Sequence, residues 1–92
     1  MLNPMVNNNS NTAKVVIYTT QRCPHCKRAK EWLKANEVLF LEFDVGKAGK
    51  MQKRFFGMGG RSVPMIVIGD RQLPGFAPKQ LKQALEHAGI LI

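Results

Sequence analysis

The sequence predicts an α/β fold whose elements follow the order β-α-β-α-β-β-α, with a four-stranded mixed sheet flanked by three helices. Two observations lead to this fold class. An apolar β-branched run, a helical pattern and a second apolar run follow one another over about thirty residues, which is typical of a βαβ unit with parallel strands. Further along, a short apolar run ends in Gly69-Asp70, which is typical of a hairpin turn and adds an antiparallel pair.

Each element is predicted from its own pattern. Lys14–Thr19 ("KVVIYT") is nearly all apolar, as in a strand that is buried on both faces. The next segment begins with a proline and places Cys26, Ala29 and Leu33 on one face, which predicts a helix with an apolar side. In order along the chain, we expect strands and helices at residues 14–19, 24–36, 38–45, 47–57, 65–68, 71–73 and 78–89.

The helix expected at residues 47–57 has the weakest pattern. Ala48, Met51 and Phe55 line one side of it. Gly49 weakens it, and Gly57 is expected to end it, because glycine is the common residue at a helix C-terminus.

The chain has 92 residues, 45% of them hydrophobic, which predicts one small globular domain at residues 14–92. Residues 1–13 are polar and rich in asparagine, so we expect a disordered tail there. The sequence shows no export signal, and no apolar run approaches the ~20 residues that cross a membrane. We therefore expect a cytoplasmic protein that acts as a monomer and keeps its two cysteines in a reducing compartment.

Cys23 and Cys26 are the only cysteines, and they occupy "CPHC", where the first strand runs into the first helix. A structural zinc site takes four ligands, whereas this chain offers only His25 between the cysteines and His87 far along the sequence. A structural disulfide across so short a loop removes little entropy from the unfolded chain. A redox pair fits better, because residues i and i+3 of a helix lie about 5–6 Å apart, close to the Cα separation of a disulfide.

The two cysteines are expected to play different roles. Cys23 falls at the helix start, where unpaired N–H groups and the positive charge of Arg22 and Lys27 favour a thiolate. Cys26 falls on the apolar face, so we expect Cys23 to attack a disulfide and Cys26 to resolve the mixed disulfide. Two interpretations of His25 stay open: a solvent-facing spacer, or a group that stabilises the Cys23 thiolate and makes the disulfide a better oxidant.

With these residues the chain resembles the glutaredoxin family of the thioredoxin fold, from about Lys14 to Gly89. The resemblance rests on "YTTQRCPHC", "RSVPMIVI" and "LPGFAP", in this order. It implies a thiol–disulfide oxidoreductase with no bound cofactor, and a cis Pro64 beside the cysteine pair. The backbone of Val63 would then be free to pair with an extended substrate or with glutathione.

Three positions depart from the glutaredoxin pattern for binding glutathione. Thr20 stands where the family has a lysine, His25 where it often has a tyrosine, and Phe76-Ala77-Pro78 where it has a polar or acidic pair. "GFAP" and "RSVP" instead resemble the glutaredoxin-like redoxins that serve ribonucleotide reductase and take electrons from thioredoxin reductase. The arginine of their turn is missing here, so glutathione as co-substrate and thioredoxin reductase both stay open as electron donors.

The formal net charge is +8, with dense basic stretches at residues 27–34 and 47–54. They are interpreted either as solvated helix faces or as an attraction for an anionic partner, such as a glutathione carboxylate, an acidic reductase surface or nucleic acid. Nucleic acid is disfavoured, because no nucleic-acid-binding motif is present. An iron–sulfur cluster shared by Cys23 of two subunits is disfavoured by the stiff Pro24.

The sequence therefore predicts a dithiol oxidoreductase that reduces protein disulfides or glutathione mixed disulfides. The alternative is a redoxin that passes electrons from thioredoxin reductase to ribonucleotide reductase. No metal site is expected. The expected catalytic residues are Cys23, Pro24, His25 and Cys26, and the expected substrate- or glutathione-binding residues are Thr20, Arg22, Arg61, Ser62, Val63, Pro64, Gly75 and Phe76.

Overall fold

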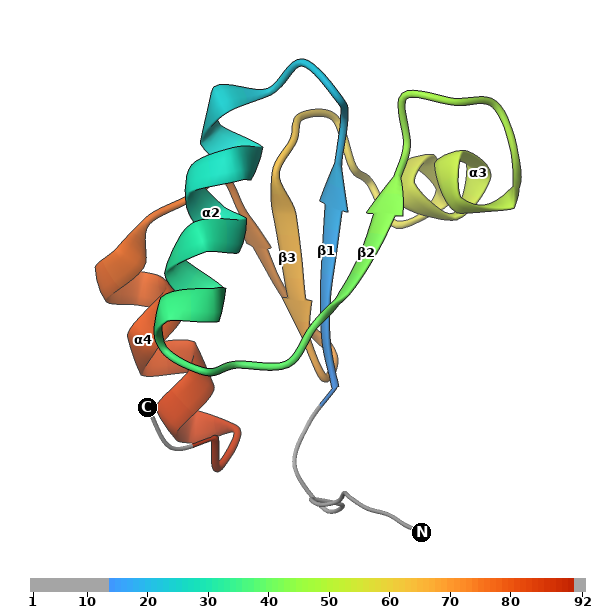
Figure 1. Ribbon diagram of the computed structural model, residues 1–92. Coiled ribbons are helices and arrows are strands. Elements are labelled where there is room, and N and C mark those ends of the chain that lie inside the picture. Colours follow the sequence, from blue (N-terminus) through green and yellow to red (C-terminus); the bar gives the residue numbers. More distant parts are fainter. Residues whose placement is uncertain (1–13, 91–92) are drawn as a thin grey trace, which may run out of the picture.

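The computed structural model describes residues 14–90 (Figure 1). The tail expected at residues 1–13 lies outside this part of the chain. Four strands and three helices follow one another in the predicted order, which confirms the α/β class. Their bounds are β1 Val15–Thr19, α2 Pro24–Ala35, β2 Leu41–Asp44, α3 Lys50–Gly57, β3 Met65–Ile68, β4 Arg71–Pro74 and α4 Pro78–His87.

The sheet is mixed, as predicted, with the strand order β2-β1-β3-β4. β1 pairs in parallel with β2, from Val16 opposite Leu41 to Thr19 opposite Asp44. β1 also pairs antiparallel with β3, which continues into β4 as a hairpin. In this register Tyr18 lies opposite Met65, so the end of β1 that leads to the cysteines lies beside the start of β3.

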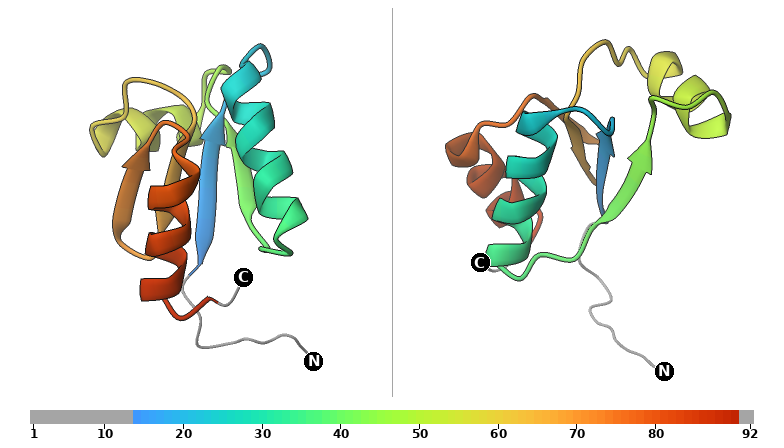
Figure 2. Two further views of the ribbon diagram at one scale, coloured as in Figure 1. Left: turned by 90° about the vertical axis from the view of Figure 1, so that its left-hand side faces the viewer. Right: turned by 45° about the horizontal axis from the view of Figure 1, so that its top comes forward.

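The sheet separates two hydrophobic clusters of unequal size. α2 and α4 cover one face and α3 covers the other (Figure 2). The α2/α4 cluster contains ten buried residues: Val15, Ile17, Ala29, Leu33, Val38, Ile66, Ile68, Leu81, Ala84 and Leu85. The α3 cluster contains four: Tyr18, Val45, Phe55 and Met65. Side chains of β1 alternate between the two clusters, which confirms that this strand is buried on both faces.

Two elements are shorter than the sequence pattern predicted, whereas the other ends agree within two residues. β2 pairs only from Leu41 to Asp44, since the Val38 N–H is already bonded to the Leu33 carbonyl at the end of α2. α3 begins at Lys50 and not at residue 47, with Gly49 as a non-helical N-cap. Ala48 therefore lies exposed in the preceding loop and does not line the helix.

All three helices end in one hydrogen-bond pattern, the Schellman motif, in which the residue after the C-cap adopts a left-handed conformation. At α2 the bonds run from Val38 N–H to the Leu33 carbonyl at 2.9 Å and from Glu37 N–H to the Lys34 carbonyl at 3.0 Å. The left-handed residues are Glu37, with a φ of 59°, Gly59 and Gly89. α3 ends at Gly57, as predicted, but the left-handed glycine of its C-terminal motif is Gly59.

Candidate active site

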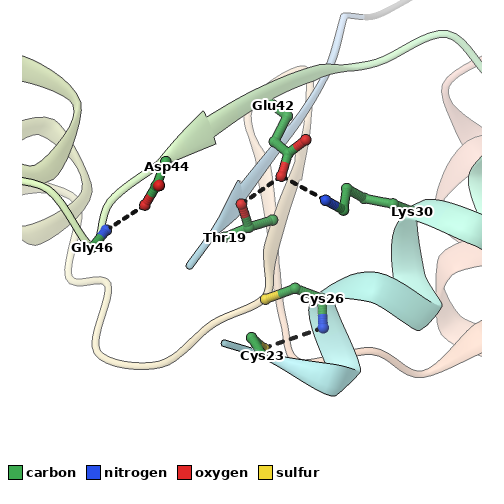
Figure 3. Close-up of polar contacts among 7 residues, drawn as sticks. All are labelled: Thr19, Cys23, Cys26, Lys30, Glu42, Asp44 and Gly46. Carbon is green, nitrogen blue, oxygen red and sulfur yellow. Dashed lines mark hydrogen bonds and ion pairs between the residues drawn. The ribbon is translucent and has the colours of Figure 1, made fainter. Parts of the chain in front are cut away.

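Cys23 and Cys26 lie at the N-terminus of α2 (Figure 3). Cys23 is the N-cap residue, and its Sγ accepts a hydrogen bond from the Cys26 N–H at 3.2 Å. Pro24 occupies the first turn, where its missing N–H leaves no carbonyl unpaired. The start of the helix therefore presents a backbone N–H and the positive end of its dipole to the Cys23 sulfur.

The two thiols differ in exposure. Cys23 is half-buried, whereas Cys26 is only 1% exposed. Burial, and then the hydrogen bond to the Cys23 side chain, raises the pKa of Cys26 to about 12. A backbone hydrogen bond with Thr20 and the charge of Lys30 act in the opposite direction but do not offset this effect. Cys26 is consequently a neutral thiol at physiological pH, as befits the inner member of the pair.

A polar cluster beside Cys26 was missed by sequence reasoning. Glu42 Oε2, on β2, accepts hydrogen bonds from Lys30 Nζ at 2.8 Å and from Thr19 Oγ1 at 2.7 Å (Figure 3). The hydrogen bond from Lys30 holds the pKa of the Glu42 carboxyl below its ordinary value, with a smaller contribution from Thr19. One cavity of about 470 Å³ is lined by this cluster and by Cys26. The one signal in the sequence was a glutamate between the apolar residues Leu41 and Phe43 of the expected strand.

The Val63–Pro64 segment lies against the cysteine pair. The peptide bond between these residues is cis, as the family resemblance implies. The Val63 carbonyl is 3.8 Å from Cys23 Sγ, and the buried Pro64 carbonyl accepts a hydrogen bond from Gly75 N–H at 2.8 Å. Within residues 14–90, the Val63 N–H donates to no backbone carbonyl. A backbone donor is thus free next to Cys23, where an extended chain can pair with it.

The other expected site residues lie around this centre at different depths. Thr20 is half-buried and lines the cavity beside the cysteines. Thr20 and Arg22 also line a second cavity of about 260 Å³ that reaches the loop after β2. Gly75 adopts a left-handed φ of 78°, and Phe76 is half-buried against the α2/α4 cluster. The remaining residues are all exposed: Arg22, Pro24, His25, Arg61 and Ser62.

Between residues 14 and 90, no three His, Cys, Asp or Glu side chains gather where they could hold a metal ion. The helices in that range include none that is long and apolar enough to cross a membrane. The site brings together two thiols three residues apart, one half-buried and one buried, with the Val63 backbone beside them.

Fold and site together define a thioredoxin-fold protein with a dithiol centre, and comparisons with known proteins specify the family. The Glutaredoxin family model matches residues 15–73. The glutaredoxin-like protein NrdH of Lactococcus lactis subsp. cremoris is 31% identical over 67 residues, which are 73% of this chain and 93% of the relative. The glutaredoxin of Pseudomonas aeruginosa is 40% identical over 78 residues, 84% of this chain and 89% of the relative.

A solved structure agrees with these relatives. The crystal structure of the thioredoxin-like protein BC3987 superposes with a TM-score of 0.73 at 37% identity, covering 78% of this chain and all of the other. The chain belongs to the glutaredoxin family. Members of this family are thiol–disulfide oxidoreductases and need no tightly bound cofactor.

Proposed function

We propose that the protein reduces disulfides of other proteins by a dithiol mechanism, with Cys23 as the nucleophile and Cys26 as the resolving thiol. The observation that supports this assignment most directly is the difference in burial between the two sulfurs. A half-exposed Cys23 at a helix N-cap is reachable by a substrate, whereas Cys26 is reachable only by Cys23 itself.

The proposed reaction has two exchange steps. The Cys23 thiolate attacks one sulfur of the substrate disulfide, whose S–S bond breaks, and the departing sulfur takes up a proton. Cys26 then loses its proton and attacks Cys23, which releases the second substrate thiolate and forms the Cys23–Cys26 disulfide. Two electrons have passed to the substrate, and an external reductant must return them.

The Val63 backbone is proposed to align the substrate for the first step. Its free N–H and its carbonyl border Cys23, so an extended peptide can add to this edge as a short strand. Side chains of Arg61 and Ser62 are exposed just before this edge and would contact the same peptide.

The mechanism is tested by changing one thiol at a time. Cys23→Ser should abolish reduction of a protein disulfide, whereas Cys26→Ser should still attack it and accumulate a mixed disulfide that mass spectrometry detects. Full activity of the Cys23→Ser variant would refute the assignment. Trapping through Cys26 in that variant would reverse the two roles.

We propose thioredoxin reductase as the electron donor, with ribonucleotide reductase as the first substrate to test. Thr20 cannot supply the lysine charge that glutaredoxins offer a glutathione carboxylate. Ala77, the N-cap of α4, has no side-chain hydrogen bond with which to hold the other end of glutathione. The Lactococcus relative, which is named NrdH, and the "GFAP" turn support the same choice.

The donor is tested by following NADPH consumption with a model disulfide in two mixtures. One contains glutathione and glutathione reductase, and the other contains only thioredoxin reductase. Turnover in the second mixture alone is the expected result, and turnover in the first alone would assign glutathione as the donor.

We further propose that the protein works as a monomer in the cytoplasm, where its cysteines are kept reduced.

A further inference from the structure

One exposed side of α3 carries only positive charge. Lys50, Lys53 and Arg54 are exposed on this helix, and they are called the α3 basic face below. Helical spacing places them on the side opposite Phe55, the buried residue that anchors α3 to the sheet. From Gly46 to Gly69 the sequence contains five lysines and arginines and no acidic residue, so the helix and both of its loops share this charge.

Among residues 14–90, none of these three side chains forms an ion pair. The single ion pair among residues 14–90 joins Lys30 of α2 to Glu42 of β2, away from α3. Like charges three and four residues apart on a helix repel one another and destabilise it by a few tenths of a kcal/mol. Their mutual repulsion opposes helix stability, and together they create a positive field directed at an approaching molecule.

The α3 basic face lies at the same end of the sheet as the cysteines. In both Figure 1 and Figure 2, α3 and the loop that leads into α2 lie at the end where β1 and β2 finish. The connection from α3 to Val63 is short and closely held. Gly60 N–H donates to the Phe55 carbonyl at 2.9 Å, and Gly60 packs directly against the Phe55 ring. These contacts connect the end of α3 directly to the loop that leads to the backbone edge beside Cys23.

An apolar side chain accompanies the charges. Phe56 is 60% exposed, although it follows the buried Phe55 and contacts it with ring centroids 5.7 Å apart. Aromatic residues and arginine are enriched at protein–protein interfaces, where the ring supplies buried area and the charge supplies orientation.

We propose that the α3 basic face, with Phe56 at its border, docks an acidic segment of the protein whose disulfide is being reduced. The inference rests on the proposed function, because it assigns the surface that holds a substrate while Cys23 attacks. Charge complementarity identifies the partner: a surface with three cations and no anion attracts carboxylates, and a neutral or basic protein gains nothing from it. Docking there leaves the Val63 edge free for the segment that carries the disulfide.

The test uses two synthetic peptides of equal length with one internal disulfide, one flanked by glutamates and the other by glutamines. The pre-reduced full chain reacts with each in a single turnover, so no electron donor is needed. Lys53→Gln/Arg54→Gln removes two charges from the α3 basic face. Lys14→Gln/Arg71→Gln removes one lysine and one arginine from the opposite end of the sheet, where both residues are exposed, and is the matched control.

We expect the wild-type chain to reduce the acidic peptide about tenfold faster than the neutral one at low salt, since electrostatic steering raises association rates by about 10–10³. The preference should fall about fivefold in Lys53→Gln/Arg54→Gln, persist in the control variant, and vanish in ~1 M salt, where the Debye length is about 3 Å.

Several results would overturn the inference. Equal rates for the two peptides in the wild-type chain would leave the proposed function intact and reject the docking surface. An equal loss in the control variant would show that net charge alone acts. Saturable binding of a short DNA at physiological salt, lost in Lys53→Gln/Arg54→Gln, would assign the surface to nucleic acid. Failure to reduce either peptide would reject the proposed function together with the inference.

Discussion

Gly60 packs so closely against Phe55 that one added methyl group should disturb the whole α3 side of the protein. A Cβ at position 60 would lie 2.5 Å from two carbons of the Phe55 ring and 2.7 Å from a third, well inside van der Waals contact. Phe55 is only 3% exposed and its ring contacts Tyr18 at a centroid distance of 5.6 Å, so the ring has no free space to enter. Overpacking of this kind costs about 1–3 kcal/mol.

The measurement is thermal or urea unfolding of Gly60→Ala beside Gly57→Ala. A Cβ at Gly57 would meet nothing within 4 Å, and this residue lies in the last turn of α3, so its replacement should stabilise the chain by about 0.5–1 kcal/mol. Each kcal/mol shifts the Tm by roughly 4–8 °C in a domain of this size. The two variants should therefore move in opposite directions from the wild-type chain.

Gly60→Ala should also slow disulfide reduction, because Gly60 lies three residues before Val63 and the loop must shift to relieve the contact. A Gly60→Ala variant as stable as the wild-type chain would refute the packing explanation. Lost stability with unchanged activity would show that the loop adjusts without moving the Val63 edge.

Three further outcomes follow from the structure. Glu37→Gly should stabilise the protein by about 0.5–1 kcal/mol in urea unfolding. A left-handed conformation costs a non-glycine residue roughly 1–2 kcal/mol, and the larger backbone entropy of glycine in the unfolded chain offsets part of that gain. Glu37→Ala keeps a Cβ and should show no such gain. Glu42→Gln should cost at most about 1 kcal/mol at pH 7, since the ion pair with Lys30 is partly exposed. The pKa of Glu42 is lowered in the folded state, so the stability difference between wild type and Glu42→Gln should be present above pH 4.5, the ordinary pKa. It should disappear as the pH falls through the pKa of the folded state, and a difference that grows on acidification would contradict the assignment. Resolution of a mixed disulfide on Cys23 should accelerate about tenfold per pH unit between pH 7 and 9, because burial raises the pKa of Cys26 well above its ordinary value, and a plateau in stopped-flow records over that range would show that Cys26 ionises more easily.

Local sequence patterns predicted the order of the elements and the position of the cysteines. Pro24 and Pro78 mark helix starts, and the apolar run in β1 marks a strand with two covered faces. The start of β2 was misjudged because the Val38 N–H bonds to the Leu33 carbonyl at the end of α2, so pairing with β1 begins only at Leu41. Val38 is buried although it lies in the loop before β2. Sequence periodicity cannot distinguish an apolar residue buried in a loop from one paired in a strand.

The cluster around Glu42 escaped prediction for a similar reason. Its members come from β1, α2 and β2, and only the parallel register, which sets Ile17 opposite Glu42, turns the carboxylate toward the face that α2 covers. A shift of the register by one residue would reverse that orientation. The cysteine pair was predictable because both residues lie within one helical turn, whereas this cluster depends on strand pairing that the sequence does not display.

The unequal clusters on the two faces of the sheet have a consequence for local opening. Four buried residues hold α3, while ten hold α2 and α4, so the α3 side has less apolar contact to lose when it separates from the sheet. Amide hydrogens of α3 should exchange with solvent at lower free energies than those of α2. α3, the helix proposed to bind substrate proteins, thus lies on the side of the sheet that opens locally at the lower free energy. Cys26 lies on α2, on the side that resists local opening.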